Sequence, residues 1–532
     1  MSQSTALITG NSSYNGIDNP EQSPLIQGIF DDPTCVPGRI LSLHKNRSPI
    51  IHPFLRTLNN VLVGRRGRRP TQWELWAGVR LPVILMQILI EEDMWSRDEG
   101  SFKNVLYSLE LLITLRQCLL TLTGPYEIPD ESTFATSYDA SCAQDCLLYM
   151  DNFAVALWKN RDLLQVEHLE DEHRHSAHFA LPAQECMLAL CQIHDRMHSK
   201  TPEPSSAAGA FLMYCWIYSP SANVDALRVQ KFLHYFLTDH HTDQQRIIKG
   251  ILKPGDSSIR DCAVQVCKFL RAENILGYDA KTLAALCYSF VEVYPEVFFK
   301  VDLPARKGLL ASLITCCQRQ HCSSDEGVWI IAIGFSMQTF QCLLSLPGDA
   351  VVRQFGEYAG RLNFATILKW SIMPAVQNVK QDFFDILVVV MRGLQRYITI
   401  LYGDLESRAA QKKTPIYLTT ARVWHDTMSQ LSYNPTNGVQ QLRLKQKAMQ
   451  AWKEYGRSLG LHTGMSVSTA LTARGPSELS DVTPYWRIPR RCFWRECGCA
   501  TGRAGHRLRV AKWSGTNRFE GELIRQTLRY VM

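Results

Sequence analysis

Apolar residues recur at intervals of three and four along most of the chain from Thr71 onward. This spacing returns side chains to one face of a helix, so it predicts amphipathic α-helices rather than strands. Between Ser101 and Gly124 the apolar residues occupy more than one face, which predicts a helix packed between neighbours. They include Val105, Leu106, Leu109, Leu112, Ile113 and Leu120.

The same pattern predicts further helices on both sides of this one. Thr71 and Glu74 have the spacing of a capping box, and Pro82 is expected to kink or divide the apolar stretch that ends at Ile90. Alternating strand patterns bounded by Asn-Gly or Asp-Gly turns are nearly absent, so no substantial sheet is expected. The later predicted helices span residues 138–169, 182–198, 207–218, 224–236, 258–272, 280–293, 304–317, 327–345, 351–358, 364–370, 376–402, 417–431 and 437–459.

About fourteen helices with short connections favour an all-α fold, in which successive helix pairs bury one another as in armadillo and HEAT proteins. No clean repeat of about 40 residues is visible, so the predicted stack is irregular. An irregular helical globule is the alternative that this pattern leaves open.

Composition divides the chain into four regions. Residues 1–50 are rich in Ser, Asn, Gly, Pro and Asp and are expected to be a disordered or loosely attached leader. Residues 51–459 form the predicted helical body, and the Gly-, Ser- and Thr-rich residues 460–484 have the composition of a linker. Residues 485–532 form a small cysteine-containing and basic C-terminal segment.

The net charge of +7 is concentrated at the C-terminus. Residues 481–532 contain eleven Lys and Arg against four Asp and Glu, which leaves 46 of each sign in residues 1–480. Because nucleic-acid binding along a broad surface needs a sustained basic face, this neutral body argues against such a surface.

Cysteine usage and hydropathy favour a soluble protein of a reducing compartment, the cytoplasm or the nucleus. Fourteen of the seventeen cysteines lie outside the C-terminal segment, many of them among aliphatic and aromatic residues, which is typical of buried reduced thiols. The N-terminus lacks the basic and apolar regions of a signal peptide. No uninterrupted apolar run reaches the length of about 18 residues that a membrane span needs, so no membrane association is expected.

Two body segments contain possible metal ligands, but each has a simpler interpretation. The run from Glu167 to His178 holds four histidines among carboxylates, which also fits a solvated connector between helices. Cys316 and Cys317 continue an apolar helix on which adjacent side chains point about 100° apart, so buried thiols are the better interpretation. The common nucleophile, phosphate-binding, dinucleotide-binding and kinase motifs are all absent, so no enzyme activity is predicted.

The run from Arg490 to Lys512 is the segment whose composition points most directly to a function. Cys492, Cys497 and Cys499 lie within eight positions, and His506 follows. A small polar segment with almost no aliphatic residues cannot fold by burial alone, whereas zinc binding by thiolates can supply folding free energy. We therefore predict Cys492, Cys497, Cys499 and His506 as candidate zinc ligands.

The letters CFWRECGC, a basic spacer and HRLRV at 506–510 resemble the first half of the MYND-type zinc finger found near the C-terminus of many proteins of mushroom-forming fungi. In those proteins an armadillo-like helical body precedes the finger. The resemblance implies Cys492 and Cys497 as the first ligand pair, with Cys499 as a further ligand and His506 as a landmark before the second pair.

After Val510 the chain departs from the family pattern, which continues with further cysteines and a closing His and Cys. The chain has no cysteine or histidine beyond His506, so a complete two-zinc finger is not present. Three explanations remain open: a degenerate finger, one zinc held by Cys492, Cys497, Cys499 and His506, or a gene model that departs from the true reading frame after Val510. The sharp end of the match favours the third.

These observations predict a non-enzymatic protein-protein interaction protein, a helical scaffold followed by a MYND-like segment. The resemblance implies protein partners that include proline-rich peptides. Two alternatives stay open: a relative of SET-type lysine methyltransferases, in which a MYND finger is sometimes embedded, and a zinc-dependent nucleic-acid-binding or transcription-associated protein that uses the basic tail.

Overall fold

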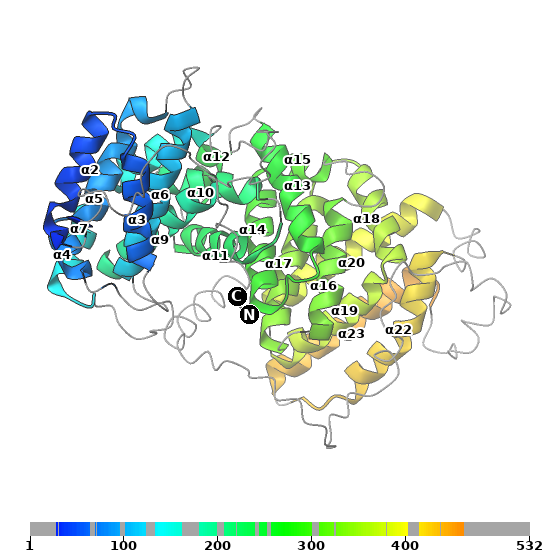
Figure 1. Cartoon of the computed structure of the whole chain (residues 1–532). Helices are drawn as coiled ribbons and strands as arrows, with labels where there is room; N and C mark the ends of the chain where they lie inside the picture. Colours follow the sequence, from blue (N-terminus) through cyan, green and yellow to red (C-terminus); the bar gives the residue numbers. More distant parts are fainter. Residues whose placement is uncertain are drawn as a thin grey trace, which may run out of the picture. The chain divides into compact units, whose positions relative to one another are not determined.

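The computed structural model describes one chain as an all-α protein (Figure 1). It describes residues 28–461, except for residues 30, 64–69, 71, 96–101, 124–133, 162–179, 199–206, 220, 240–243, 253–256, 301–307, 324–325, 379, 403–413 and 437. Every regular element of this part of the chain is an α-helix or a 3₁₀-helix, and it contains no strand. None of its helices is both long enough and apolar enough to cross a membrane.

The chain divides into two compact units, residues 1–258 and residues 259–532, and the predicted helical body of residues 51–459 extends over parts of both. Helices of the first unit pack in two layers. One layer runs from α2 through α5, α7 and α10 to α12, and the other from α3 through α6 and α9 to α11. The elements of this unit are η2 (Pro33–Cys35), α2 (Val36–Lys45), α3 (Ile51–Val63), α4 (Trp73–Gly78), α5 (Leu81–Ile90), η3 (Glu92–Trp95), α6 (Phe102–Thr123), α7 (Ser137–Lys159), α9 (Ala180–His198), α10 (Ala207–Ile217), α11 (Val224–Asp239) and α12 (Gln244–Ile251).

The second unit, residues 259–532, has the same kind of layering. Helices α14, α17, α20 and α23 pack in succession, and α16, α18, α19 and α22 cover them. Its helices are α13 (Ser257–Arg271, which begins at the boundary), α14 (Gly277–Val293), α15 (Pro295–Lys300), α16 (Leu309–Ser323), α17 (Glu326–Leu344), α18 (Ala350–Arg361), α19 (Phe364–Gln377), α20 (Gln381–Tyr402), α22 (Pro415–Tyr433) and α23 (Val439–Ser458).

Local sequence explains where several helices begin. Pro82 lies in the first turn of α5, after α4 has ended at Gly78, so the predicted division of this stretch is confirmed. The predicted capping box involves Thr71, which lies outside the described residues; α4 begins after an N-cap at Gln72 that makes no side-chain capping bond. A capping box occurs instead at Thr136 and Asp139, at the start of α7.

The leader and several predicted boundaries need correction. Residues 36–45 were expected in a disordered or loosely attached leader but form α2, whose Val36 and Ile40 are fully buried and which packs against α5. A few aliphatic residues at helical spacing are enough here, because a neighbouring helix covers them. Helix α7 ends at Lys159 rather than at residue 169, and α19 continues through Pro374 to Gln377 rather than ending at residue 370.

Large aromatic side chains fill the space between the layers of each unit. In the second unit the indole N–H of Trp424 donates to the carbonyl of Trp452 and the indole of Trp452 donates back, both at 3.2 Å. Tyr455 is fully buried and its hydroxyl lies 3.0 Å from that of Thr420. These three hydrogen bonds satisfy the buried indole and hydroxyl groups of Trp424, Trp452, Thr420 and Tyr455 and tie α23 to α22.

Candidate functional site

The predicted zinc ligands Cys492, Cys497, Cys499 and His506 lie outside the described residues, and so does the histidine-rich run at residues 167–178. Their prediction rests on the sequence alone. Within the part of the chain that the structure describes, no three His, Cys, Asp or Glu side chains lie together in a way that could hold a metal ion.

The body cysteines that the structure describes are free thiols, and most are buried, as predicted. Cys316 and Cys317 lie on α16 with almost no exposed surface. Burial raises the pKa of Cys316 and raises that of Cys317 to about 12, because a thiolate loses its hydration there. A thiol that stays protonated is a poor metal ligand, so these two residues serve the core of the second unit.

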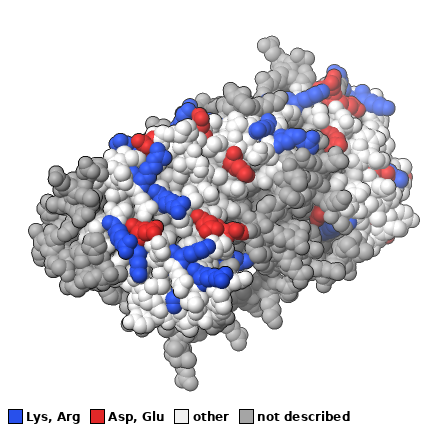
Figure 2. Space-filling model, turned by 180° about the vertical axis from the view of Figure 1, so that it is seen from behind, with Lys and Arg blue, Asp and Glu red and all other residues white. Residues whose placement is uncertain are grey.

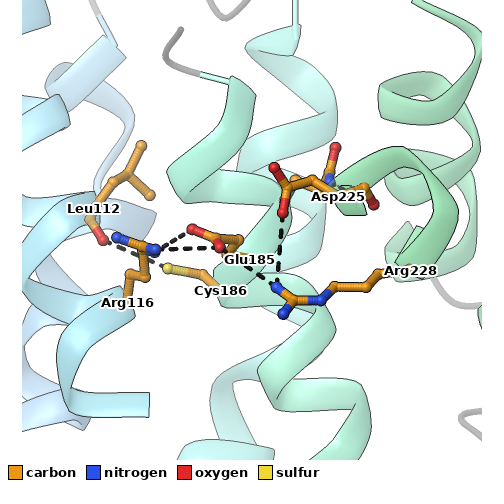
Figure 3. Close-up of polar contacts among 7 residues, drawn as sticks. Leu112, Arg116, Glu185, Cys186, Asp225 and Arg228 are labelled. Carbon is orange, nitrogen blue, oxygen red and sulfur yellow. Dashed lines mark hydrogen bonds and ion pairs between the residues drawn. The ribbon is translucent and has the colours of Figure 1, made fainter. Parts of the chain in front are cut away.

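A group of four charged side chains links three successive helices of one layer of the first unit (Figure 3). Arg116 comes from α6, Glu185 from α9, and Asp225 and Arg228 from α11. Figure 3 shows the carboxylate of Glu185 between the two guanidinium groups. We refer to these four residues as the interhelical charge cluster.

The distances within the interhelical charge cluster place the carboxylate of Glu185 at its centre. Arg116 forms an ion pair with Glu185, and its Nη2 also lies 3.2 Å from Oε1 of Glu185. Arg228 Nη1 lies 3.9 Å from the same Oε1 and 3.6 Å from Oδ1 of Asp225. The side chain of Glu185 is 10% exposed, against 30% for Arg116 and 40% for Arg228.

Burial and charge act on Glu185 in opposite directions. Burial raises the pKa of its carboxyl group, Arg116 opposes this by favouring the carboxylate, and the net result lies above the ordinary value. The guanidinium groups therefore compensate only part of the desolvation of the carboxylate. This arrangement holds α6, α9 and α11 in register, and its two positive and two negative groups leave no net charge for a ligand.

The thiol next to this cluster is not a nucleophile. Cys186 is fully enclosed, and its Sγ lies 3.5 Å from the carbonyl oxygen of Leu112 on α6. Burial and the neighbouring Glu185 both raise the pKa of this thiol. Because a reactive cysteine needs a stabilised thiolate, the surroundings of Cys186 suit a structural role.

A second polar group joins α2, α6 and the end of α5. His44 Nδ1 lies 3.0 Å from the hydroxyl oxygen of Tyr107, and its Nε2 lies 2.9 Å from Oε2 of Glu91. Burial raises the pKa of Tyr107, so its hydroxyl remains protonated and is not poised as a base. His44 therefore acts as a bridge between helices, and both of its ring nitrogens are engaged.

Charges on the face that Figure 2 shows are mixed. Lys and Arg side chains alternate there with Asp and Glu and are separated by uncharged surface. The described residues on this face therefore form no broad basic field, in keeping with the equal numbers of positive and negative side chains in residues 1–480.

Neither the interhelical charge cluster nor the His44 bridge was predicted from the sequence. Arg116 and Glu185 are 69 positions apart, and nothing in the local letters distinguishes them from charges on a solvated helix face. Comparison with models of protein families, with curated proteins and with solved structures finds no match for this chain.

Proposed function

We propose that this protein is a non-enzymatic scaffold for protein-protein interactions, built as an irregular armadillo- or HEAT-like stack. The observation that carries the proposal is the layering within each unit. In the first unit α3, α6, α9 and α11 pack in succession as one layer, and α5, α7 and α10 belong to the layer that packs against them. Helix pairs stacked in this manner present extended surfaces to partner proteins.

The chemistry of the described polar groups supports a structural rather than a catalytic use of the body. Glu185 and His44 are engaged with side chains of neighbouring helices. Cys186 and Tyr107 have raised pKa values and are held protonated by burial. Groups in these states stabilise contacts between helices, and their arrangement offers no activated nucleophile or base to a substrate.

The C-terminal segment contributes a second part of the proposal, zinc binding by Cys492 and Cys497 with Cys499 and His506. The support is the clustering of three cysteines in a segment with few aliphatic residues, together with its resemblance to the first half of a MYND-type finger. The lysine methyltransferase and nucleic-acid-binding alternatives gain no support from a described surface.

Affinity isolation of the tagged full chain from its own cells tests the scaffold. We expect the chain to retain at least one other protein in a fixed molar ratio through washing, and light scattering of the isolate to give a mass above the 60.5 kDa of one chain. Recovery of the chain without any protein in a fixed ratio would contradict the proposal. Binding of S-adenosylmethionine by the isolate would instead support the methyltransferase alternative.

A further inference from the structure

Helix α23 is the last described helix of its layer (Figure 1). The residues on its two faces differ in burial and in charge. One face is buried against α20 and α22 through fully enclosed Trp452 and Tyr455. The other carries most of its charge, and the helix holds five Lys or Arg against one acidic residue. The positive residues are Arg443, Lys445, Lys447, Lys453 and Arg457.

The outward face of α23 follows from helical geometry. At 100° per residue, positions 439, 442, 443, 446, 447, 450, 453, 454 and 457 fall within an arc of about 140°. Positions 444, 448, 452 and 455, which are buried, fall on the opposite side. Arg443, Lys447 and Arg457 are exposed on the outward arc, and none of them makes an ion pair with a residue that the structure describes.

Large apolar side chains are exposed at the N-terminal end of the same face. Val439 is 67% exposed and Leu442 is 43% exposed. Tyr433, at the end of the preceding helix, is 85% exposed. A polar outer face is what a terminal helix needs for solubility alone, so these three apolar residues need another explanation.

A lysine of α23 bonds to the C-terminal end of α22. Lys445 Nζ donates to the carbonyl oxygens of Ser432 at 3.1 Å and Asn434 at 2.7 Å, at the C-terminal end of α22. A shallow hollow beside this connection is lined by Met373, Val376, Leu431 and Pro435, among others. Lys445 therefore ties the N-terminal half of α23, which carries Val439 and Leu442, to the end of α22.

We propose that the outward face of α23, with Val439 and Leu442 at one end and Arg443, Lys447 and Arg457 along it, docks an acidic amphipathic helix of a partner protein. Aliphatic residues of that helix pack on the apolar end, and its Glu and Asp residues face the cations over a length of about 27 Å. This inference rests on the proposed function, since it names the chemistry of one partner.

Charge argues against two other occupants of this face, the C-terminal residues of this chain and a nucleic acid. Residues 481–532 carry eleven Lys and Arg against four Asp and Glu, so this part of the chain repels a basic face. A nucleic acid gains from a sustained basic surface, whereas here the cations occupy one helix face beside Glu454 and next to the aliphatic side chains of Val439 and Leu442. An aliphatic and basic surface matches an aliphatic and acidic segment.

The test uses the purified full chain and a fluorescein-labelled peptide of about 18 residues, with Leu at spacings of three and four and Glu between them. Fluorescence anisotropy measures its binding at about 0.05 M and about 0.5 M salt. Comparison probes are the same peptide with Lys for Glu, a poly(U) RNA, and vesicles of phosphatidylserine and phosphatidylcholine. The variants are R443E/K447E and L442S, with R353E/R361E on α18 as a control of equal charge change.

We expect the Glu peptide to bind at least about tenfold more tightly than the Lys peptide, with weaker binding at the higher salt. R443E/K447E and L442S should each lose about tenfold or more, while R353E/R361E binds as the unaltered chain does. Circular dichroism confirms that each variant keeps its helix content.

The inference is overturned when the Glu peptide fails to bind, when R353E/R361E loses as much as R443E/K447E, or when RNA or vesicles bind more tightly and lose their binding in R443E/K447E. These failures remain distinct from failure of the proposed function, because the affinity isolation described above detects partners bound anywhere on the chain.

Discussion

Glu185 lies between two guanidinium groups and still has a raised carboxyl pKa. Because a raised pKa means that the folded state favours the neutral form relative to the unfolded chain, the charged carboxylate is only partly compensated by Arg116 and Arg228. The two sides of the ion pair are therefore not equivalent. Removing the carboxylate charge relieves desolvation, whereas removing Arg116 leaves a buried anion with weaker compensation.

This asymmetry predicts opposite outcomes for two substitutions. E185Q should change the free energy of unfolding at pH 7 by less than about 1 kcal/mol, or raise it, because Gln keeps the shape and removes the buried charge. R116L should lower it by about 2 kcal/mol, since a buried carboxylate loses its nearest cation. Urea unfolding followed by circular dichroism measures both, and a larger loss in E185Q than in R116L would contradict the account.

The pH dependence of stability has a defined sign. Between the ordinary carboxyl pKa of 4.5 and the higher folded value, the folded state binds more protons than the unfolded chain. The contribution of Glu185 is thus fully present below pH 4.5 and is lost as the pH rises through the folded pKa. We expect the stability of the unaltered chain, measured relative to E185Q, to fall as the pH rises above the ordinary carboxyl pKa of 4.5. A rise over that range would show that the pairing with arginine dominates.

Residues of this kind are where prediction from the sequence fails. The burial of cysteines such as Cys191 and Cys287 follows from their aliphatic neighbours and was predicted. The role of Glu185 depends on Arg116 and Arg228, which the fold brings to it from two other helices. The spacing of residues along one helix does not predict such contacts with side chains of other helices.

At the scale of the element, most helices follow from apolar spacing and from proline positions, as Pro82 shows. Their N-caps were harder to place. Thr136 caps α7 because Asp139 bonds back to its backbone N–H at 3.0 Å, and Asp139 also accepts from the indole of Trp73 at 2.8 Å. The second bond joins α7 to α4 and makes Asp139 one of the few fully enclosed carboxylates. Such long-range bonds select among several possible caps.

Because Thr136 is part of a capping box, two substitutions at this position should lower the free energy of unfolding by different amounts. T136A removes the side-chain oxygen that accepts from the amide of Asp139 at 3.2 Å, so it should lower the free energy of unfolding by about 1 kcal/mol. T136S keeps this oxygen and should stay within about 0.5 kcal/mol of the unaltered chain. Equal losses in the two variants, measured by urea unfolding, would mean that the threonine methyl group matters rather than the cap.

Gly456 predicts a steric effect on the same contact that orders α23. A Cβ at this position would overlap the indole ring of Trp424, so G456A should lower the free energy of unfolding by about 2 kcal/mol. G334A on α17 is the matched control, because a Cβ there meets no atom within 4 Å. Since alanine favours helix over glycine, G334A should be neutral or stabilising by up to about 1 kcal/mol. Thermal unfolding that ranks the two variants in the reverse order would contradict this packing.

For the whole molecule, the sequence predicted the all-α class, because helical spacing persists from Thr71 onward. It did not predict the division at Ser258 or the early start at Val36, since both depend on which helices pack together. The body is electrically balanced, and the excess positive charge lies in the same C-terminal residues as the three clustered cysteines. We propose that this segment binds zinc and that it follows a helical body that binds partner proteins.

Metal analysis of the purified full chain tests the proposed zinc site most directly. We predict about one zinc per chain for the unaltered protein, and the same content for a C35S/C342S control, which removes two thiols that the structure finds free. The C492S/C497S variant should lose this zinc, because a thiolate pair is removed from the predicted site. Equal zinc in C492S/C497S and in the unaltered chain, or no zinc in either, would contradict the account.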